Sequence, residues 1–490
     1  MVLRELLSAL REPYQAAGPL DGEVTGVAYD SRRVVPGSVF VAMQGEMTDG
    51  HRYVGQAVAR GAAAVLSERP PEAEGVTWVT VTNARHALAE IAAAFYRDPT
   101  ARLTLVGVTG TNGKTTTTYL MESVLRAAGE KACVVGTISA RIGDEAFAAE
   151  RTTPEAPDLL AFLDRAAGRG CRYGLMEVSS HALDRGRAYR FRFAVAIFTN
   201  LTRDHLDYHG DFESYFRAKR LLFINESGVR PGRSVVNVDD PWGRRLAADL
   251  PDALTYGLSS AAAVHATGYT CDLKRIRLSA SVLGRSLELE SALPGKANVY
   301  NILATVATAA ALGLPDDVVR RGIGALERVP GRVERVDEGQ PFEVMVDYAH
   351  TDDALKNLLE LVSECASGRI ITVFGCGGDR DRTKRPLMGE VAGRYSDLTV
   401  ATSDNPRGED PEAILQEIEP GLKASGGAYV LIPDRRAAIR HALYGAGPGD
   451  VVVIAGKGHE TTQVIGPQVF PFDDRAVARE LIRELRRPEL

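Results

Sequence analysis

A glycine-rich segment directly after an apolar run constrains the fold of this chain more than any other feature. Residues Leu103 to Thr109 are apolar and β-branched and predict a buried strand, whereas the residues after Lys114 predict a helix. The segment between them reads Gly110, Thr111, Asn112, Gly113, Lys114, Thr115 and Thr116. A strand, a glycine-rich turn and a helix in this order are typical of a phosphate-binding loop in an α/β protein.

Each residue type in this loop suits a nucleotide. Glycines let backbone N–H groups surround the phosphates, Lys114 can neutralise the β and γ oxygens, and Thr115 offers a hydroxyl to Mg²⁺. The usual spacing places a first glycine at 108, where this chain has Val108, so the loop is a shortened variant. A glycine turn with an accidental Gly-Lys-Thr is the alternative, which the flanking strand and helix disfavour. ATP is the expected ligand.

The bulk composition excludes several other classes of protein. A length of 490 residues predicts two to four domains, and a formal charge of −6 argues against nucleic-acid binding. The five cysteines are far apart and form no CxxC pair, which favours a reducing compartment over a disulfide framework. We find no signal peptide and no apolar stretch of roughly 18 residues, so we expect a cytoplasmic protein that does not cross a membrane.

Breaks in the pattern predict three domains. The sequence Asp98-Pro99-Thr100 marks the first boundary, and Val329-Pro330-Gly331-Arg332 marks the second. We therefore expect a small N-terminal α/β domain over 1–98, a central ATP-binding domain over 99–332 and a C-terminal Rossmann-like domain over 333–490. The first of these shows short strands, such as 39–42 and 64–66, around a helix at about 53–61.

The second and third regions alternate apolar strands with helices, which predicts largely parallel sheets covered on both faces. Expected strands in the second region are 103–109, 174–178, 194–198 and 234–238, followed by a helix over 299–312. Expected strands in the third region are 344–347, 370–374, 398–402, 429–432 and 451–455. The third region is thus a second doubly wound domain.

Three polar residues follow the loop in positions that could serve phosphate chemistry. Glu177 ends a predicted strand, His205 follows the next strand, and Lys219 lies on an amphipathic helix. Taken singly, each has an ordinary reading as a strand-end acid, a loop histidine and a solvated lysine. His205 and His209 could suggest zinc, but the segment lacks the glutamate of a zinc-protease helix and ends at Gly210.

In this order behind that loop, the segments resemble the Mur ligase family of peptidoglycan synthesis, and the resemblance covers essentially the whole chain. The segments that carry it are Asp30-Ser31-Arg32, Asp49-Gly50, 110–116, 176–181, 198–210, 215–223, 298–301, Asp347-Tyr348-Ala349-His350, 375–381, Asp404-Asn405-Pro406-Arg407 and 456–460. Within the family, 404–407 resembles the form that adds meso-2,6-diaminopimelate to UDP-N-acetylmuramoyl-L-alanyl-D-glutamate, rather than the lysine-adding form.

The resemblance implies an ATP-dependent carboxylate–amine ligase that forms an acyl phosphate. It implies that Lys114 contacts the β and γ phosphates and that Thr115 and Glu177 hold one Mg²⁺. His205 and a carbamylated Lys219 (N6-carboxylysine) would hold a second Mg²⁺ near the acceptor carboxylate. The other residues implied in ATP binding are the loop residues 110–116 together with Asn298, Asn301, Arg332 and Asp347.

The resemblance also implies separate sites for the two other substrates. The UDP-linked acceptor would contact Ser31, Thr48, Thr152, Thr153, Ser179 and Arg187. The diaminopimelate would contact Arg380, Asp404, Asn405, Pro406, Arg407, Gly456 and Glu460. The expected partners are these small molecules and ATP, and the expected state is a monomer.

Three positions depart from the family pattern, and two rival functions remain. Arg185 replaces a glutamine near the acceptor, Ala297 replaces a phenylalanine near adenine, and Asp352 replaces a proline after His350-Thr351. A folylpolyglutamate synthetase-like ligase would share the loop and mechanism but lack a UDP-binding domain over 1–98. A motor or switch that hydrolyses ATP would need no second Rossmann-like domain.

Overall fold

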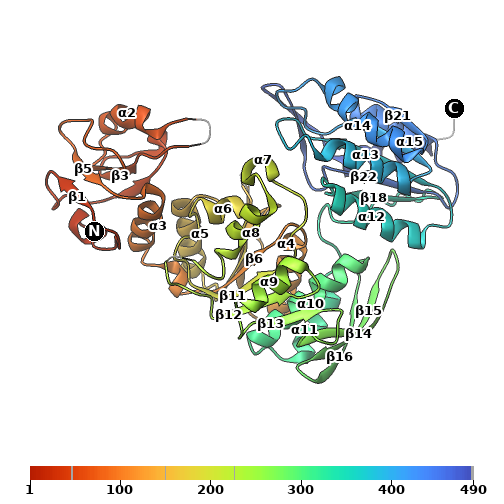
Figure 1. Cartoon of the computed structure of the whole chain (residues 1–490), viewed down its shortest axis with the longest axis horizontal. Coiled ribbons are helices and arrows are strands. Elements are labelled where there is room, and N and C mark those ends of the chain that lie inside the picture. Colours follow the sequence, from red (N-terminus) through yellow and green to blue (C-terminus); the bar gives the residue numbers. More distant parts are fainter. Residues whose placement is uncertain (46–47, 149–150, 226, 487–490) are drawn as a thin grey trace. The chain divides into compact units, whose positions relative to one another are not determined.

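The computed structural model describes residues 1–45, 48–148, 151–225 and 227–486 (Figure 1). The chain forms two compact units, each assembled from several segments. The first comprises Met1–Thr109, Gly129–Ile197 and Arg217–Ser234, and the second comprises Gly110–Ala128, Phe198–Phe216 and Val235–Leu490. Within the described ranges, no helix combines the length and apolar composition needed to cross a lipid bilayer.

The first unit begins with a five-stranded sheet in the order β1-β5-β4-β3-β2. Strands β2 to β5 are parallel, and β1 joins β5 antiparallel. Successive strand residues point to opposite faces, so Val39 packs with Leu88 of α3 while Phe40 packs with Ala57 of α2. The elements are α1 (Leu3–Leu7), β1 (Gln15–Ala17), β2 (Gly26–Ala28), β3 (Ser38–Val41), α2 (Val54–Ala59), β4 (Ala64–Ser67), β5 (Thr77–Thr80) and α3 (Ala84–Phe95), with 3-10 turns at Ser31–Arg33, Gly50–Tyr53 and Pro99–Ala101.

The rest of the first unit is built around β10, which pairs in parallel with both β6 and β7. Every residue of β10 is buried, as expected for a parallel strand covered on both faces. A short antiparallel pair, β8 and β9, extends from β7. The elements are β6 (Thr104–Thr109), β7 (Ala132–Val135), β8 (Ala140–Ile142), β9 (Glu145–Phe147), α5 (Ala156–Gly168), β10 (Tyr173–Glu177), α6 (Ser180–Asp184) and β11 (Phe193–Phe198). The last residue of β11 and most of α8 (Phe212–Arg220) belong to the second unit.

The second unit contains the helix that follows the phosphate loop and an antiparallel extension. Strand β12 pairs in parallel with β13 and β13 with β14, after which β14, β15 and β16 run antiparallel. The helix α10 carries Asn298 and Asn301, and ten of its residues are buried. The elements are α4 (Lys114–Ala127), α7 (Leu206–His209), β12 (Arg233–Asn237), α9 (Pro241–Ala248), β13 (Leu254–Gly257), β14 (Val264–Cys271), β15 (Ile276–Val282), β16 (Arg285–Ser291), α10 (Lys296–Ala311) and α11 (Asp316–Ala325).

The same unit ends in a six-stranded sheet in the order β17-β18-β22-β19-β20-β21, parallel except for β17. Helices α12, α13 and α14 pack in one apolar cluster, and α15 and α16 pack in another, so helices cover both faces. A separate hairpin, β23–β24, follows β22. The elements are β17 (Glu334–Arg335), β18 (Glu343–Asp347), α12 (Asp352–Cys365), β19 (Ile370–Cys376), α13 (Lys384–Tyr395), β20 (Leu398–Ser403), α14 (Pro411–Ser425), β21 (Tyr429–Leu431), α15 (Arg435–Tyr444), β22 (Val451–Ala455), β23 (Thr462–Ile465), β24 (Gln468–Pro471) and α16 (Asp474–Leu485).

The predicted α/β class and the doubly wound third region are confirmed. The structure adds antiparallel strands that the sequence analysis did not predict, namely β8–β9, β14–β16 and β23–β24. In β15 and β16, apolar residues alternate with polar ones because only one face is buried, and this differs from the continuous apolar runs of parallel strands. The predicted boundaries at residues 98 and 332 stay predictions.

Candidate functional site

The phosphate loop needs its two glycines for reasons of backbone conformation and space. Gly110 has a φ of +147° and Gly113 a φ of +88°, which side-chain-bearing residues rarely adopt. A Cβ at Gly110 would overlap Oγ1 of Thr199, and one at Gly113 would overlap Oδ1 of Asn301. Thr199 Oγ1 also donates to the carbonyl of Asn112 at 2.6 Å. The loop is therefore held in one shape by neighbouring side chains, with its N–H groups at the start of α4.

Cations gather at this end of α4. The Lys114 ammonium donates to the carbonyls of Gly110 at 2.9 Å and Thr111 at 2.8 Å, so it curls back over the loop. Arg332 Nη2 donates to Thr115 Oγ1 at 3.4 Å, although it comes from the start of the third domain predicted above. A helix N-terminus with two nearby cations is suited to an anion.

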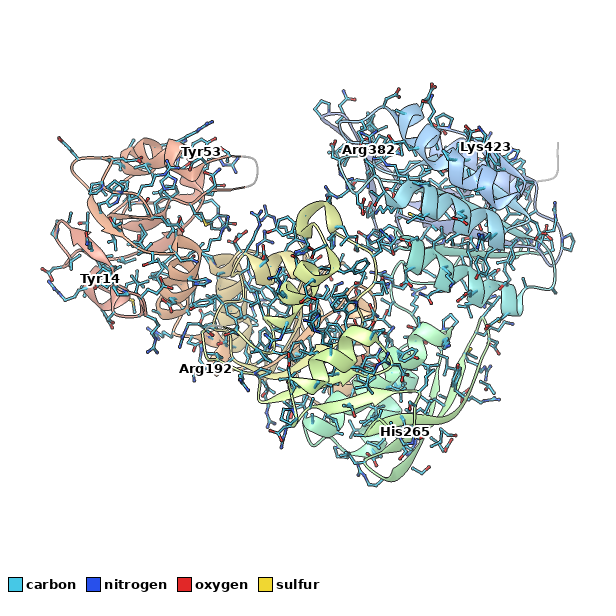
Figure 2. The ribbon with its side chains drawn as sticks, viewed as in Figure 1. Tyr14, Tyr53, Arg192, His265, Arg382 and Lys423 are labelled. Atoms are coloured by element: carbon cyan, nitrogen blue, oxygen red, sulfur yellow. The ribbon has the colours of Figure 1, made fainter. Side chains whose placement is uncertain are left out.

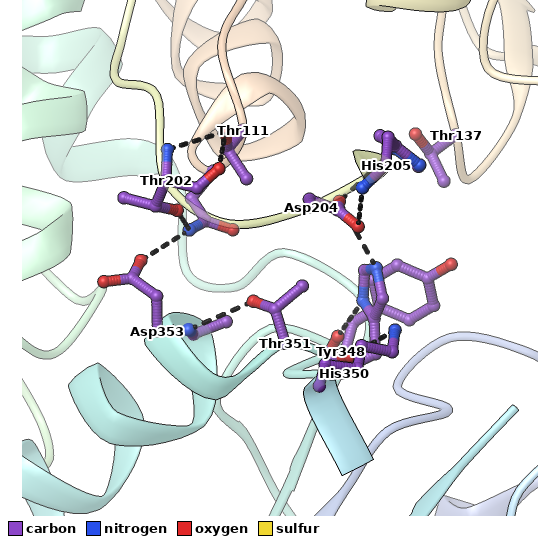
Figure 3. Close-up of polar contacts among 12 residues, drawn as sticks. Thr111, Thr137, Thr202, Asp204, His205, Tyr348, His350, Thr351 and Asp353 are labelled. Atoms are coloured by element: carbon purple, nitrogen blue, oxygen red, sulfur yellow. Dashed lines mark hydrogen bonds and ion pairs between the residues drawn. The ribbon is translucent and has the colours of Figure 1, made fainter. Parts of the chain in front are cut away.

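Asp204 is the centre of a second charged group in the same unit (Figure 3). Its carboxylate lies 3.3 Å from His205 Nε2 and 4.0 Å from His350 Nε2, and Lys384 Nζ donates to the His350 carbonyl at 2.8 Å. Burial raises the pKa of Asp204, but the charges of His205, His350, Lys384 and Lys114 outweigh burial and lower that pKa. The structure thus brings predicted Lys114 and His205 to one acidic side chain.

A carboxylate of α12 contacts the phosphate loop directly (Figure 3). Asn112 Nδ2 donates to Asp353 Oδ2 at 2.9 Å and lies 3.4 Å from Thr202 Oγ1. The Thr202 backbone N–H in turn donates to Thr111 Oγ1 at 3.0 Å. Burial raises the pKa of Asp353. These contacts link the first turn of α12, the loop after β11 and the phosphate loop.

The remaining predicted ATP-binding residues lie in two places of the same unit. Asn301 Nδ2 donates to Asn298 Oδ1 at 2.9 Å, and Thr117 Oγ1 of α4 lies 3.5 Å from Asn301 Oδ1, so both asparagines lie beside the loop helix. Asp347 ends β18 and accepts the N–H of Val333 at 2.7 Å. Burial raises the pKa of Asp347.

Glu177 is the centre of a hydroxyl-rich cluster in the first unit. Its two carboxylate oxygens accept hydrogen bonds from the N–H and the hydroxyl of Thr137, both at 2.9 Å. Thr137 Oγ1 lies 3.0 Å from Thr152 Oγ1, and Thr153 Oγ1 donates to the Glu177 carbonyl at 2.8 Å. The Ser179 N–H donates to Thr153 Oγ1 at 3.1 Å. The predicted metal ligand and three predicted acceptor residues therefore form one group.

Arg187 belongs to the same cluster through Thr153 and Glu155. Its Nη1 donates to the Thr153 carbonyl at 3.1 Å, and its Nε lies 2.8 Å from Glu155 Oε1. Burial lowers the pKa of Arg187, while Glu155 opposes that shift. A guanidinium is thus held at the edge of this hydroxyl-rich cluster.

Lys219 is unusually well shielded for a lysine. It lies near the end of α8 and is 1% exposed, whereas most lysines keep the ammonium in water. Its neighbours in the helix, Phe216 and Ala218, are buried as well. The side chain is therefore part of the interior, and the alternative reading of Lys219 as a solvated surface lysine can be discarded.

The first-domain residues Ser31 and Thr48 both contact other side chains. Ser31 Oγ donates to Gln56 Oε1 at 2.7 Å, and Thr48 Oγ1 lies 3.2 Å from the hydroxyl of Tyr53, which Figure 2 labels. Ser31 begins a 3-10 turn in which the Asp30 side chain accepts the Arg32 N–H. Thr48 lies two residues before the next 3-10 turn, Gly50–Tyr53.

A hydrogen-bonded series beside Thr48 has the residue types of a serine-hydrolase triad. Asp49 Oδ1 lies 2.6 Å from His51 Nδ1, and His51 Nε2 lies 2.8 Å from Ser67 Oγ. Ser67 is 0% exposed and also accepts the N–H of Arg69. A substrate cannot reach this hydroxyl, so the series fixes the Asp49–His51 turn instead of providing a nucleophile.

In the C-terminal sheet, the loops after β19 and β20 bring two arginines together. Arg407 Nη1 donates to the Gly378 carbonyl at 2.8 Å. Burial lowers the pKa of Arg407, and the nearby charge of Arg380 lowers it further. Two arginines on neighbouring loops are suited to an anion, such as a carboxylate.

Beside them, Lys457 connects three of the predicted diaminopimelate residues. Its side chain is 0% exposed, and its ammonium lies 3.0 Å from Glu460 Oε2, 3.1 Å from Asn405 Oδ1 and 3.8 Å from Asp404 Oδ1. Burial raises the pKa of Asp404, and the Lys457 charge opposes that effect. Gly456 has a φ of +113°, and a Cβ there would lie 2.9 Å from Asp404 Oδ2.

A buried ion pair contacts the strand ends next to this network. Arg435 and Asp474 have side chains that are each 0% exposed, and Arg435 Nη2 lies 2.6 Å from Asp474 Oδ2. The remaining donors of Arg435 reach the carbonyls of Ser403 at 3.2 Å and Ala455 at 3.0 Å, which end β20 and β22. The pair therefore joins α15 and α16 to the strand ends that carry the predicted amine site.

Glu409 is held by a different arginine. Arg385, 0% exposed, donates to both Glu409 oxygens, at 2.9 and 2.8 Å, and to Glu417 at 2.8 Å. Glu409 also accepts the Asp379 N–H at 2.6 Å. The hydrogen bond from Arg385 lowers the pKa of Glu409 to about 2.

We expect Glu409→Gln to reduce the free energy of unfolding by about 1–3 kcal/mol near neutral pH, because a charge-assisted bond to buried Arg385 is weakened. A pKa lowered from 4.5 to about 2 means that the ionised group stabilises the fold above pH 4.5 and loses this effect as pH falls toward 2. Urea unfolding at several pH values should show the difference between variant and wild type shrinking below pH 4.5. Glu412→Gln, at an exposed position of α14, is the matched control. A difference that stays constant with pH would contradict this interpretation.

The sequence analysis missed several residues of these groups. Among them are Thr137, Asp204, His350, Lys384 and Lys457. Asp204, His350 and Lys457 lie inside segments that resemble the family, so the signal was present, but nothing in the sequence shows which side chains face one another. Thr137 lies in the bend after β7, outside the motif segments, and Lys384 begins α13, three residues after the segment 375–381.

Family comparisons cover all three regions of the chain. The model described as "Mur ligase family, catalytic domain" matches residues 23–96, "Mur ligase middle domain" matches 108–309, and "Mur ligase, glutamate ligase domain" matches 331–458. Two proteins named UDP-N-acetylmuramoyl-L-alanyl-D-glutamate–2,6-diaminopimelate ligase are each 49% identical. The one from Solibacter usitatus covers 99% of this chain and 98% of itself, and the one from Geobacter metallireducens covers 98% of each.

Solved structures agree with these matches. A structure with the same enzyme name is 31% identical, has a TM-score of 0.70 and covers 100% of both chains. The MurF ligase from Thermotoga maritima, solved in complex with ADP, has a TM-score of 0.62 at 19% identity and covers 95% of this chain and 97% of its own, so it supports the fold alone. Because relatives at 49% identity span nearly the full length, the chain belongs to the Mur ligase family.

Proposed function

We propose that this protein is an ATP-dependent ligase that joins meso-2,6-diaminopimelate to the glutamate of UDP-N-acetylmuramoyl-L-alanyl-D-glutamate in peptidoglycan precursor synthesis. The observation that carries the proposal is the 49% identity over 99% of the chain to a relative whose name states this reaction. The side-chain groups described above are proposed to bind the nucleotide, the acceptor and the amine.

Activation of the acceptor is the chemical problem that the nucleotide solves. A carboxylate is a poor electrophile because its charge repels an amine and oxide is a poor leaving group. Transfer of the γ-phosphoryl group of ATP to the carboxylate gives an acyl phosphate and ADP. The amine then attacks the carbonyl carbon, and the tetrahedral intermediate expels phosphate as the amide forms and the amine loses a proton. Catalysis of the transfer depends on positioning and on neutralising charge.

The loop and its neighbours are suited to the nucleotide. In the proposal, the loop N–H groups and Lys114 bind the β and γ phosphates, and Arg332 reaches the same end of α4. Asn298 and Asn301 lie on the helix beside the loop and are proposed to contact adenine. Asp347, buried at the end of β18, is proposed to contact the nucleotide as well.

Magnesium ions fit the oxygen donors of this chain. Thr115 and Glu177 are proposed for one ion, and His205 with a carbamylated Lys219 for the other. Within the described ranges, no three His, Cys, Asp or Glu side chains are grouped closely enough to hold a metal by themselves. Mg²⁺ commonly keeps several waters and uses one or two carboxylates together with substrate phosphates. When bound, the ions neutralise the charge that develops on the transferred phosphoryl group.

The acceptor and the amine have separate proposed sites. Thr152, Thr153, Ser179 and Arg187 belong to the cluster of Glu177 and are proposed to hold the dipeptide end of the acceptor. Ser31 and Thr48 are proposed to contact its UDP end. Arg380 and Arg407 are proposed to bind a carboxylate of diaminopimelate, and Glu460 an ammonium. Asp204 and His350 connect the loop after β11 to the end of β18 and would keep these segments aligned.

The alternative functions are not favoured. A folylpolyglutamate synthase from Mycobacterium tuberculosis has a TM-score of 0.60 at 17% identity, which supports a shared fold alone. The relatives named above carry the diaminopimelate name, which disfavours the lysine-adding form. A monomeric state and a cytoplasmic location remain predictions from the sequence.

The proposal is tested by incubating the protein with ATP, Mg²⁺, the UDP-linked dipeptide and radiolabelled diaminopimelate. We expect labelled UDP-linked tripeptide, one phosphate released per amide formed, and almost no phosphate when the amine is omitted. Reactions with lysine and without the acceptor are the controls. Phosphate release that is independent of the amine would indicate a motor or switch, and equal use of lysine would overturn the proposed amine.

A further inference from the structure

We propose that the hairpin β23–β24, acting mainly through Gln463, is a positioning element that sets the direction of the Arg407 side chain and so helps to select the amine substrate. The inference rests on the proposed function, because it assigns a role in choosing that substrate. Gln463 is not proposed to touch the substrate itself.

Both peptide groups of Arg407 are bonded to the hairpin. The Arg407 N–H donates to the Val464 carbonyl at 3.0 Å, and the Gly466 N–H donates to the Arg407 carbonyl at 2.7 Å. Arg407 and Ile465 form an isolated parallel bridge. The hairpin therefore acts as a short extra strand along the loop that follows β20.

The backbone of Arg407 requires such support. Its φ of +53° lies in the left-handed region, which costs a side-chain-bearing residue free energy and persists only where the surroundings enforce it. In an extended conformation the Cβ, and with it the guanidinium, would point elsewhere. In the observed conformation Nη1 reaches the Gly378 carbonyl at 2.8 Å, with Arg380 nearby.

Gln463 anchors the loop three residues earlier. It is 8% exposed, and its Nε2 donates to the Asp404 carbonyl at 2.8 Å. The next residue, Val464, donates its N–H to Asn405 Oδ1 at 3.0 Å. Asn405 Nδ2 meanwhile donates to Glu460 Oε2 at 2.8 Å. Both polar atoms of the Asn405 side chain are thus bonded within the protein. In the amine site this side chain connects the hairpin with Glu460.

The hairpin is held in position mainly by these hydrogen bonds. All four residues of β24 are exposed, including Val469 at 62% and Phe470 at 43%, and Ile465 on β23 is 40% exposed. A two-stranded hairpin is at best marginally stable alone, so its register depends on what it binds. The loop and the hairpin consequently hold each other in one arrangement.

The test compares Gln463→Met with Gln468→Met. Methionine keeps the length of glutamine but lacks the donor, and Gln468 is an exposed residue on the other strand of the same hairpin. We expect Gln463→Met to raise the KM for diaminopimelate about 5- to 10-fold, the loss of one hydrogen bond, with the KM for ATP unchanged. Gln468→Met should match the wild type. If Gln463→Met does not fold, Gln463→Glu removes the same donor and should raise the KM at least as much.

A double-mutant cycle decides whether Gln463 acts through Arg407. In the Arg407→Ala background, Gln463→Met should change the KM for diaminopimelate by less than about 2-fold, because the side chain that it positions is gone. A full additive effect, or an equal loss in kcat and in affinity for ATP, would overturn the inference. An unchanged KM in Gln463→Met would also overturn it. Failure of the wild type to use diaminopimelate would instead count against the proposed function.

Discussion

Replacement of Lys219 by alanine is expected to reduce ligation by at least about 100-fold, the loss typical when a group that supports a catalytic metal is removed. The proposed role is that of a carbamate, because a bare ammonium has no lone pair for a metal, whereas a carbamate presents two oxygens to Mg²⁺. A position with 1% exposure is compatible with a built-in ligand and unlike that of a solubilising lysine. The measurement is steady-state formation of the UDP-linked tripeptide.

Small carboxylic acids such as acetate should partly restore the activity of Lys219→Ala, because they can supply an oxygen ligand in the space that the side chain leaves. Lys219→Arg keeps a positive charge but cannot carry the carbamate, so it should remain as inactive as the alanine variant. Lys356→Ala, at a 52%-exposed side chain of α12, is the control and should behave as the wild type. Near-normal activity of Lys219→Ala, together with a free ammonium seen in a nucleotide complex, would refute the carbamate.

Arg407→Ala is expected to raise the KM for diaminopimelate by roughly 30-fold to several thousand-fold, since losing a charge-assisted pair in a closed site costs on the order of 2–5 kcal/mol. Diaminopimelate and lysine differ at the distal end, where one carries an additional carboxylate and the other ends in an ammonium. A guanidinium binds the carboxylate with two parallel hydrogen bonds and repels a lone ammonium. Selection therefore combines attraction and repulsion.

Binding of ATP, measured by titration calorimetry, should be unaffected in Arg407→Ala, because Arg407 lies on the loop after β20 and the nucleotide residues lie on other elements. Arg382→Ala is the matched control (Figure 2). The Arg382 side chain is 64% exposed and pairs with Glu417. Its removal should leave the KM for diaminopimelate and the KM for ATP unchanged. A wild-type enzyme that uses lysine as readily as diaminopimelate would show that Arg407 does not select the amine.

The sequence predicted the buried parallel strands best. Strand β22 has the predicted bounds Val451–Ala455, and β6 begins one residue later than predicted, at Thr104. Parallel strands covered on both faces are continuous apolar runs that end at glycine or polar residues, so both the type and the limits are visible. The loop between β6 and α4 was also predictable. The succession of strand, glycine-rich turn and helix along the sequence is enough to identify it.

The antiparallel strands were less visible because they are half exposed. Residues Arg285–Ser291 of β16 alternate buried and exposed positions and include two glutamates, which reads as a polar stretch unless the period of two is noticed. The turn before it uses Leu283 at a φ of +52°, a residue that gives no turn signal. The hairpin β23–β24 lacks even this alternation, since its order depends on partners in a distant loop.

The groupings within the candidate site were the least predictable part. The motifs identified Lys114 and His205 as site residues. Only the structure shows that both lie near the carboxylate of Asp204. Asn405 was expected as a substrate contact, and the structure shows that its amide already bonds Glu460 and Lys457. Such partnerships arise from tertiary packing between segments that are more than fifty residues apart.

The buried pair of Arg435 and Asp474 has a consequence for how the C-terminal sheet is completed during synthesis. Until Asp474 has been synthesised, buried Arg435 lacks its ion-pair partner, and a buried pair that is broken in this way costs about 3–5 kcal/mol. The strand ends that carry the proposed amine site, Ser403 and Ala455, share that guanidinium. A nascent chain that lacks α16 would therefore hold Ser403 and Ala455, and with them the proposed amine site, less firmly than the chain with α16 does.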